Sequence, residues 1–293
     1  PLVGFIVAAP ESMTFTGGSG AAPWPTVSPD GRRLIFSATD AAGVSQLWMR
    51  ELSSDVVRPL ALTQGAIQPF WAPDSEQIAY FQDGALKILI LSSGISRTVC
   101  RVSPGPRRGS WGAQGDILFA ARDLPIQRVS QNGGTPQSVT TLEPGDPNTQ
   151  HFYPSFLPDG ERFLFAVAGL GPESQPSRIM LGRLGSSTAT PVVEGLSEAH
   201  YVDPGYVIYA RVRVWLAQRV DPASVSPTAA APIPLAQNVS FNTNSGSTAV
   251  SVSAHALAYH SDARVVSDIV ERDRRGRHVR TLAAGVEQGG LAL

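Results

Sequence analysis

The sequence predicts an all-β protein built from one repeated unit, and two observations support this. A segment of twelve residues occurs three times with small changes, at residues 25–36, 69–80 and 154–165. Three weaker copies continue the series, so that successive copies lie 40 to 50 residues apart. Four-stranded units that recur about every 40–45 residues are typical of a β-propeller, in which they form blades around a central channel. We therefore expect one propeller domain over residues 1–293.

Each of the three strong copies is predicted to be a hairpin. Proline fixes φ, aspartate accepts hydrogen bonds from nearby backbone, and glycine adopts positive φ, so these residue types together favour a tight turn. A short apolar segment rich in β-forming residues follows each turn, as at 34–36. The residues of this structural turn motif are Pro29, Asp30, Gly31, Pro73, Asp74, Pro158, Asp159 and Gly160.

The recurring aspartates of the turns allow two interpretations. They could form a ring of carboxylates that binds a cation, or each could hydrogen-bond its own turn. A propeller holds the turns of different blades far apart around the disc, so one metal ion cannot bind several of them. We therefore interpret Asp30, Asp74 and Asp159 as turn formers.

The remainder of each unit supplies two more strands. Residues 46–52 and 56–62 follow the first hairpin, and residues 85–91 and 95–100 follow the second. The weaker copies keep the strand pattern and lose most of the turn motif. Six blades are thus expected, with turns near Asp30, Asp74, Gln114, Asp159, Pro204 and Ala254.

The pattern continues beyond the sixth turn. Residues 272–282 are predicted to be the outer hairpin of the sixth blade, and residues 290–293 the inner strand of a seventh blade that is truncated. We therefore expect the chain to be a fragment of a longer protein. A ring left open in this way would expose unpaired backbone groups at its edge, which favours association.

Composition and motifs limit the classes of function. The net charge of −1 argues against nucleic acid as a partner. The sequence contains no Gly-x-Ser-x-Gly, Gly-x-x-x-x-Gly-Lys, His-Glu-x-x-His or Cys-x-x-Cys motif. No apolar segment reaches the roughly 18–20 residues that span a membrane. We therefore expect a chain that is not an enzyme, has no cofactor or metal, and makes no membrane contact itself.

Function is expected in the loops that lead into the innermost strands, because these loops open on one mouth of the channel and vary while the scaffold repeats. A protein, a peptide or a small ligand could bind there. The loops are residues 63–68, 103–109, 143–151, 194–200 and 238–247. Their candidate binding side chains are Arg107, Arg108, His151, His200 and Asn242.

The repeats resemble the TolB-type, WD-like propeller repeat, whose core reads Trp-Ser-Pro-Asp-Gly-x-x-Ile-Ala-Phe. The order of the variants along the chain resembles the propeller that follows the kinase domain in bacterial eukaryotic-like Ser/Thr protein kinases. The residues that carry this second resemblance are Phe15 with 27–36, then 46–50, 69–75, 156–165, 204–209, 216–222, 250–253 with 257–259, and 273–277. It implies a cytoplasmic kinase domain and one membrane helix upstream. The propeller itself would be an extracytoplasmic or periplasmic sensor that binds a protein or ligand in signal transduction.

Two alternatives remain open, because the same repeat unit occurs in other proteins. The chain could be the propeller domain of a prolyl-oligopeptidase-like serine peptidase, which requires a Gly-x-Ser-x-Gly motif downstream. It could also be a TolB-like periplasmic interaction protein, which requires a secretory signal and no attached enzyme. The neighbouring coding sequence on each side would distinguish the three.

Overall fold

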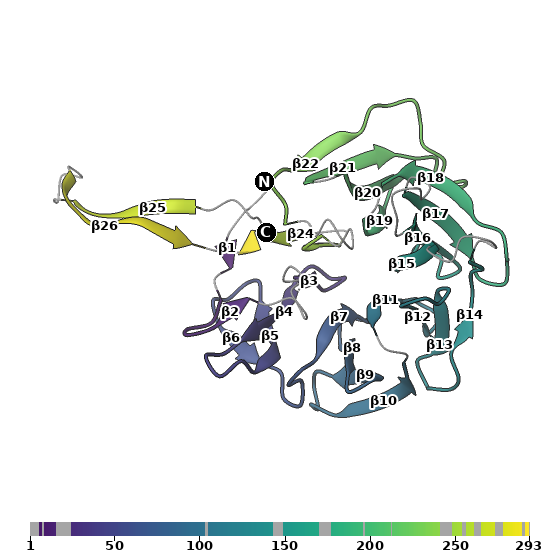
Figure 1. Ribbon diagram of the computed structural model, residues 1–293, viewed down its shortest axis with the longest axis horizontal. Helices are drawn as coiled ribbons and strands as arrows, with labels where there is room; N and C mark the ends of the chain where they lie inside the picture. Colours follow the sequence, from purple (N-terminus) through teal and green to yellow (C-terminus); the bar gives the residue numbers. More distant parts are fainter. Residues whose placement is uncertain are drawn as a thin grey trace.

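The computed structural model describes residues 6–7, 9–15, 25–102, 105–142, 149–169, 177–195, 197–211, 213–240, 248–253, 256–260, 265–272, 278–288 and 291–292. Every strand pairing in these ranges is antiparallel, and the sheets are arranged in a ring (Figure 1), with a central channel lined by their innermost strands. The described part of the chain contains no helix with the length and apolar character needed to cross a membrane.

Five blades are each made from four consecutive strands, which run from the channel to the rim. The first blade contains β3 (Thr26–Val27), β4 (Arg33–Thr39), β5 (Ser45–Glu51) and β6 (Val57–Pro59), with β2 (Thr14–Phe15) also paired to β4. The second contains β7 (Ile67–Trp71), β8 (Gln77–Gln82), β9 (Ala85–Ile90) and β10 (Ser96–Arg101). The third contains β11 (Pro106–Trp111), β12 (Asp116–Ala121), β13 (Gln127–Ser130) and β14 (Gln137–Ser138).

The fourth and fifth blades follow the same order. The fourth contains β15 (Thr149–Phe156), β16 (Arg162–Gly169), β17 (Arg178–Arg183) and β18 (Thr190–Glu194). The fifth contains β19 (Ala199–Val202), β20 (Tyr206–Arg211), β21 (Val214–Arg219) and β22 (Ile233–Ala236).

A further sheet, which we call the closing sheet, joins the two ends of the chain between the fifth and first blades. Its order is β1 (Ile6–Val7), β27 (Leu291–Ala292), β24 (Leu257–His260) and β23 (Val250–Val252). Val7 and Ala258 share an apolar cluster with Val27 of the first blade, and Val250 shares another with Trp215 of the fifth. The ring is therefore closed by strands from both ends of the chain.

The expectation of six blades and a truncated seventh is wrong, because the described residues form five blades. The strands of the sixth copy are completed by β27 and β1, and residues 291–292 belong to this closing sheet. β25 (Val265–Arg272) and β26 (His278–Gln288) form a separate two-stranded sheet that extends away from the ring (Figure 1). The physical reason is that an exposed strand edge leaves backbone groups unpaired, and the N-terminal strand pairs with the edge that the repeats leave open.

The apolar core lies between neighbouring blades. Trp71 and Tyr80 of the second blade pack with Leu47 of the first. Phe81 and Phe119 join the second and third blades, with ring centroids 6.1 Å apart. Trp71 and Trp111 are only 6% and 7% exposed, so the recurring indoles pack between blades.

Hydrogen bonds between innermost strands hold neighbouring blades at fixed positions around the channel. The indole Nε1 of Trp71 donates to the carbonyl of Thr26 at 2.9 Å. Two serine hydroxyls, on Ser251 and Ser110, each accept a backbone N–H from the adjoining inner strand at 2.9 Å. Buried polar groups cost free energy unless they are paired, so these bonds specify which strands adjoin.

Candidate functional site

Three neighbouring inner strands carry the same β-bulge. Gln68, Arg108 and Tyr153 adopt φ of 52°, 53° and 54°, and the strand register shifts at each of them. The backbone N–H of Arg108 donates to Oε1 of Gln68, so the first two bulges contact each other. A left-handed conformation costs a non-glycine residue about 1–2 kcal/mol. Bulges commonly change the direction of a side chain, and here they occur where the strands face the channel.

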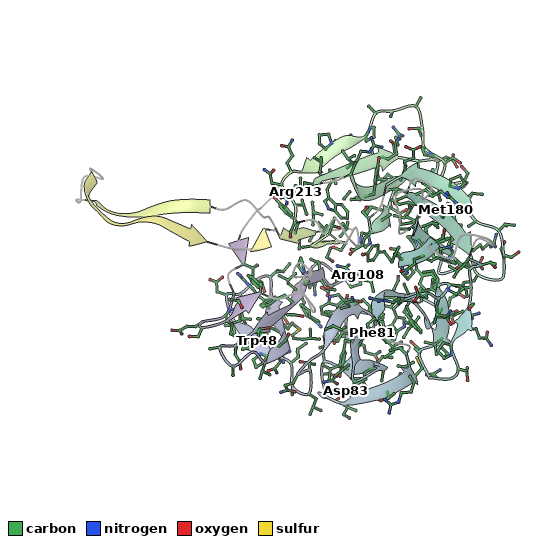
Figure 2. All side chains as sticks on the ribbon, in the orientation of Figure 1. Trp48, Phe81, Asp83, Arg108, Met180 and Arg213 are labelled. Atoms are coloured by element: carbon green, nitrogen blue, oxygen red, sulfur yellow. The ribbon has the colours of Figure 1, made fainter. Side chains whose placement is uncertain are left out.

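The channel contains a cavity of about 350 Å³. The innermost strands of all five blades and of the closing sheet line it, and the labelled Arg108 lies near the centre of the ring (Figure 2). Pro29, Pro158, Asp203 and Ser253 also line the cavity, so it extends to the turns that follow the inner strands.

Arg108, Glu198 and His200 meet in this cavity. Nη1 of Arg108 lies 2.8 Å from Oε2 of Glu198, and Nε2 of His200 lies 3.9 Å from the same oxygen. Nδ1 of His200 is 3.3 Å from the Ser155 hydroxyl, and the imidazole stacks on the Trp215 indole. The Ser155 hydroxyl and the Trp215 indole therefore both position the His200 ring.

Glu198 is the most confined charged group of the cavity. Its side chain is 2% exposed, and neither carboxylate oxygen accepts a hydrogen bond from the described part of the chain. The 2.8 Å contact with Arg108 is an ion pair without hydrogen-bond geometry. A buried charge is stabilised fully only when it is both paired and hydrogen-bonded. The carboxylate therefore retains the capacity to accept hydrogen bonds.

The structure brings two of the predicted site residues together, Arg108 and His200, and separates His151 from them. His151 is 4% exposed and lines a second cavity of about 160 Å³ with Thr140 and Arg178. Its Nδ1 is 2.8 Å from the Thr140 hydroxyl. Burial lowers the pKa of His151 to about 4, and the nearby positive charge of Arg178 adds to this, so the imidazole is neutral near neutral pH.

The other two predicted residues are Arg107 and Asn242. Arg107 lies in β11, where its backbone pairs with Ala120. Asn242 lies outside the described residues. The strands also begin earlier than expected: Arg107, Arg108, His151 and His200 all belong to inner strands rather than to loops. The bulges explain part of this difference, because one irregular residue interrupts the alternation from which strand starts are predicted.

Sequence reasoning did not select Glu198. One local signal was available, since Glu198 and His200 are two residues apart and side chains at that spacing share a face of an extended strand. Its partner Arg108 is on another blade, and no local pattern connects the two. Among the described residues, no group of three or more His, Cys, Asp or Glu side chains is placed to hold a metal ion.

The turn aspartates bind their own backbone. Oδ1 of Asp30, Asp74 and Asp159 accepts the N–H two residues ahead, at 3.0, 2.8 and 2.9 Å. Burial is the largest single influence on the pKa of Asp30 and Asp159 and acts to raise both. Hydrogen bonds outweigh it and lower both pKa values, chiefly from the Ser28 hydroxyl to Asp30 and from the Arg162 backbone N–H to Asp159.

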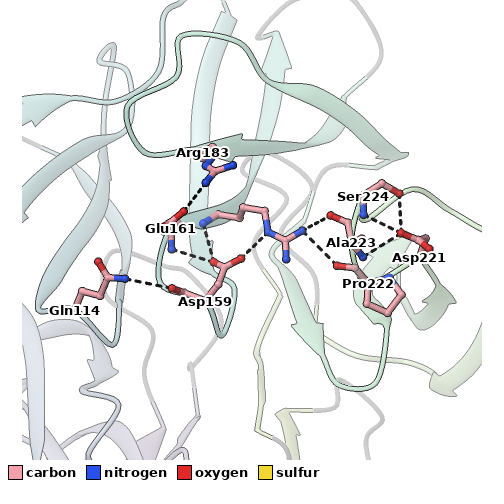
Figure 3. Close-up of polar contacts among 9 residues, drawn as sticks. Gln114, Asp159, Glu161, Arg183, Asp221, Pro222, Ala223 and Ser224 are labelled. Atoms are coloured by element: carbon pink, nitrogen blue, oxygen red, sulfur yellow. Dashed lines mark hydrogen bonds and ion pairs between the residues drawn. The ribbon is translucent and has the colours of Figure 1, made fainter.

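The turns also connect neighbouring blades. Nε of Arg162 donates to Asp159 at 2.6 Å, within the network of polar contacts around Asp159 in Figure 3. Nη1 of Arg162 donates to the Ala223 carbonyl at 2.6 Å, so the fourth blade is tied to the fifth. Gln114 of the third blade reaches the carbonyl of Asp159 at 3.4 Å.

The fold and its channel define a β-propeller of four-stranded antiparallel blades. The sequence matches no family model, and none of the curated proteins is similar to it. Among solved structures, TolB from Acinetobacter baumannii is similar with a TM-score of 0.56 and 12% identity, over 73% of this chain and 54% of TolB. This chain therefore spans about half the length of that TolB.

Two enzymes whose reactions differ also have structures similar to this chain. Oligogalacturonate lyase from Vibrio parahaemolyticus has a TM-score of 0.53 and 10% identity, over 99% of this chain and 96% of the lyase. A prolyl endopeptidase has a TM-score of 0.53 and 16% identity, over 94% of this chain and 43% of the peptidase. At these identities the likeness shows the fold alone, because one fold supports many functions.

Proposed function

We propose that this chain is a non-enzymatic binding module whose central cavity takes a small ligand or the end of a peptide. The observation that carries the proposal is the buried Glu198 carboxylate, which lies beside Arg108 and His200 in a cavity lined by every innermost strand. Ligand sites in proteins are concave and mostly apolar, with a few convergent polar groups. This cavity has that character.

A catalytic function is the second candidate, because Ser155, His200 and Glu198 have the residue types of a hydrolytic triad. Their geometry favours binding instead. His200 and Glu198 are 3.9 Å apart, which is too long for the hydrogen bond that orients a catalytic base, and Glu198 pairs more closely with Arg108. We expect a fluorophosphonate probe to leave Ser155 unlabelled. Labelling that is lost in Ser155→Ala would support hydrolysis and contradict the non-enzymatic proposal.

The same proposal assigns the module to the extracytoplasmic side of a bacterial Ser/Thr protein kinase, where it would act as a sensor. The support is the order of repeat variants along the sequence. A kinase domain and one membrane helix encoded upstream are expected. A Gly-x-Ser-x-Gly motif downstream would instead favour the peptidase alternative, and a secretory signal without an attached enzyme would favour a TolB-like protein.

Binding in the cavity can be tested by blocking it. Val202 lines the cavity, so Val202→Trp should fill part of it. Ile95 is 59% exposed and does not line the cavity, so Ile95→Trp is the matched control. In a ligand-observed NMR screen of fragments with mixed charge, we expect hits that bind the wild type and Ile95→Trp but not Val202→Trp. No hits, or hits that Val202→Trp retains, would contradict the proposal.

A further inference from the structure

We infer that the cavity selects ligands carrying an organic ammonium group, from a free amine or from the N-terminus of a peptide, and that Glu198 binds this group. The inference rests on the proposed function, because it specifies what the same cavity takes. It follows from the hydrogen-bonding state of Glu198, from the charges that line the cavity, and from the apolar side chains around them.

The Glu198 carboxylate lacks hydrogen-bond donors among the described residues. An ionised carboxylate accepts at about four positions. Both oxygens are buried, and neither accepts a hydrogen bond from the described residues. Oε2 has an ion-pair contact with Arg108 at 2.8 Å. A ligand that brings several N–H donors matches this need, and an alkylammonium group brings three.

The charges of the cavity favour a cation over an anion. Arg108 is opposed by two carboxylates, Glu198 and Asp203, so the lining has one more carboxylate than guanidinium groups. Asp203 is exposed at the turn side of the cavity, where a carboxylate attracts a cation before it enters. An anionic ligand would meet repulsion from both carboxylates.

Aromatic side chains complete the site. Phe70, Trp111 and Tyr153 line the cavity with Pro154. Aromatic faces attract ammonium ions and also pack against the apolar part of a ligand. The cavity volume of about 350 Å³ is near the lower end of ligand-binding sites, which run from roughly 300 to 1,000 Å³. A single-ring amine or one N-terminal residue is of suitable size.

Three probes that share one ring test the selection on the wild-type protein. Benzylamine, benzyl alcohol and benzoate differ mainly in charge and in donor number. By titration calorimetry or NMR we expect benzylamine to bind at least about tenfold more tightly than the other two. A preference for benzoate or benzyl alcohol would overturn the inference while leaving a binding cavity, and so the proposed function, in place.

Substitution of Glu198 tests the residue itself. Glu198→Gln keeps the shape and removes the charge, and we expect it to weaken benzylamine binding at least about tenfold. Glu161→Gln is the control, because Glu161 forms an exposed ion pair with Arg183 and does not line the cavity. Unchanged affinity in a folded Glu198→Gln protein would overturn the inference. If that variant fails to fold, the three-probe comparison on the wild type still decides.

A further binding experiment with peptides distinguishes the two sources of the ammonium group. A short peptide with an aromatic first residue is compared with its N-acetylated form. Tighter binding of the free peptide than of benzylamine would identify a peptide N-terminus as the source, and the reverse would identify a free amine. If neither ammonium probe binds while the fragment screen gives hits, the inference fails alone. If the screen is also empty, the proposed function fails with it.

Discussion

The indole of Trp71 donates a 2.9 Å hydrogen bond to the backbone carbonyl of Thr26 on the neighbouring blade. The residue that recurs in the sequence repeat therefore also joins two repeats. Trp111 occupies the corresponding place one blade further on, but its indole donates to Gln131 within its own blade, at 3.1 Å. Trp71 thus links two blades through its indole, whereas the indole of Trp111 bonds within one blade.

Trp71→Phe should destabilise the protein more than Trp111→Phe does. Both changes remove the same volume, whereas only the first removes a bond between blades and leaves the Thr26 carbonyl without that donor. The lost hydrogen bond should cost roughly 1–2 kcal/mol of unfolding free energy beyond the loss in Trp111→Phe. Urea unfolding followed by far-ultraviolet circular dichroism measures both. Equal losses would show that the bond between blades contributes no more than the bond of Trp111 to Gln131 within one blade.

Gly109→Ala should destabilise the third blade. A Cβ at this position would lie 2.5 Å from two ring atoms of Phe70 and 2.9 Å from the Leu118 carbonyl oxygen. Overpacking of this kind costs roughly 1–3 kcal/mol. The thermal midpoint should fall accordingly. Adding Phe70→Leu to Gly109→Ala should recover part of the loss, and additive losses in the double variant would contradict the proposed clash.

Burial of neutral His151 should make stability depend on pH. Its pKa falls from 6.5 to about 4 on folding, so between these values the unfolded state binds more protons than the folded state. The stabilising contribution is complete above pH 6.5 and is lost as the pH falls towards 4. The loss over this range amounts to roughly 3 kcal/mol. His151→Gln should reduce the fall in unfolding free energy over this range.

Thr140→Val provides the control for His151, because it removes the hydroxyl beside Nδ1 and leaves the buried imidazole. Its unfolding free energy should be lower at every pH, with the slope of the wild type. If His151→Gln and the wild type lose the same free energy between pH 6.5 and 4, His151 does not have the depressed pKa.

Arg162→Lys should weaken the contact between the fourth and fifth blades. The guanidinium donates both to the Asp159 carboxylate and to the Ala223 carbonyl, at 2.6 Å each, and a lysine cannot reproduce this fork. The expected loss is about 1 kcal/mol in chemical unfolding. Arg183→Lys is the matched change in an exposed pair with Glu161, where the loss should stay below about 0.5 kcal/mol. A loss in Arg183→Lys as large as in Arg162→Lys would argue against a special role for the fork.

Several parts of the fold could be predicted because they depend on residues close together in the chain. Asp74, for example, receives a hydrogen bond from the backbone N–H of Glu76, and the apolar strand begins directly after that turn. Such local chemistry predicts the hairpin and its repetition wherever it occurs. The candidate site could be predicted only in part: Arg108 and His200 were selected and meet in the cavity, while His151 lies elsewhere and Glu198 was missed.

The sequence by itself determined the repeated four-stranded blade and the propeller class, because turn chemistry and strand alternation act over a few residues. Only the tertiary structure decided the number of blades, since the closing sheet pairs Ile6 with Ala292 and no local pattern marks that pairing. Only the tertiary structure could place Glu198, which directly precedes β19 of the fifth blade, against Arg108 of β11 in the third. Contacts of this kind arise when the ring closes, and they depend on the arrangement of the blades in space.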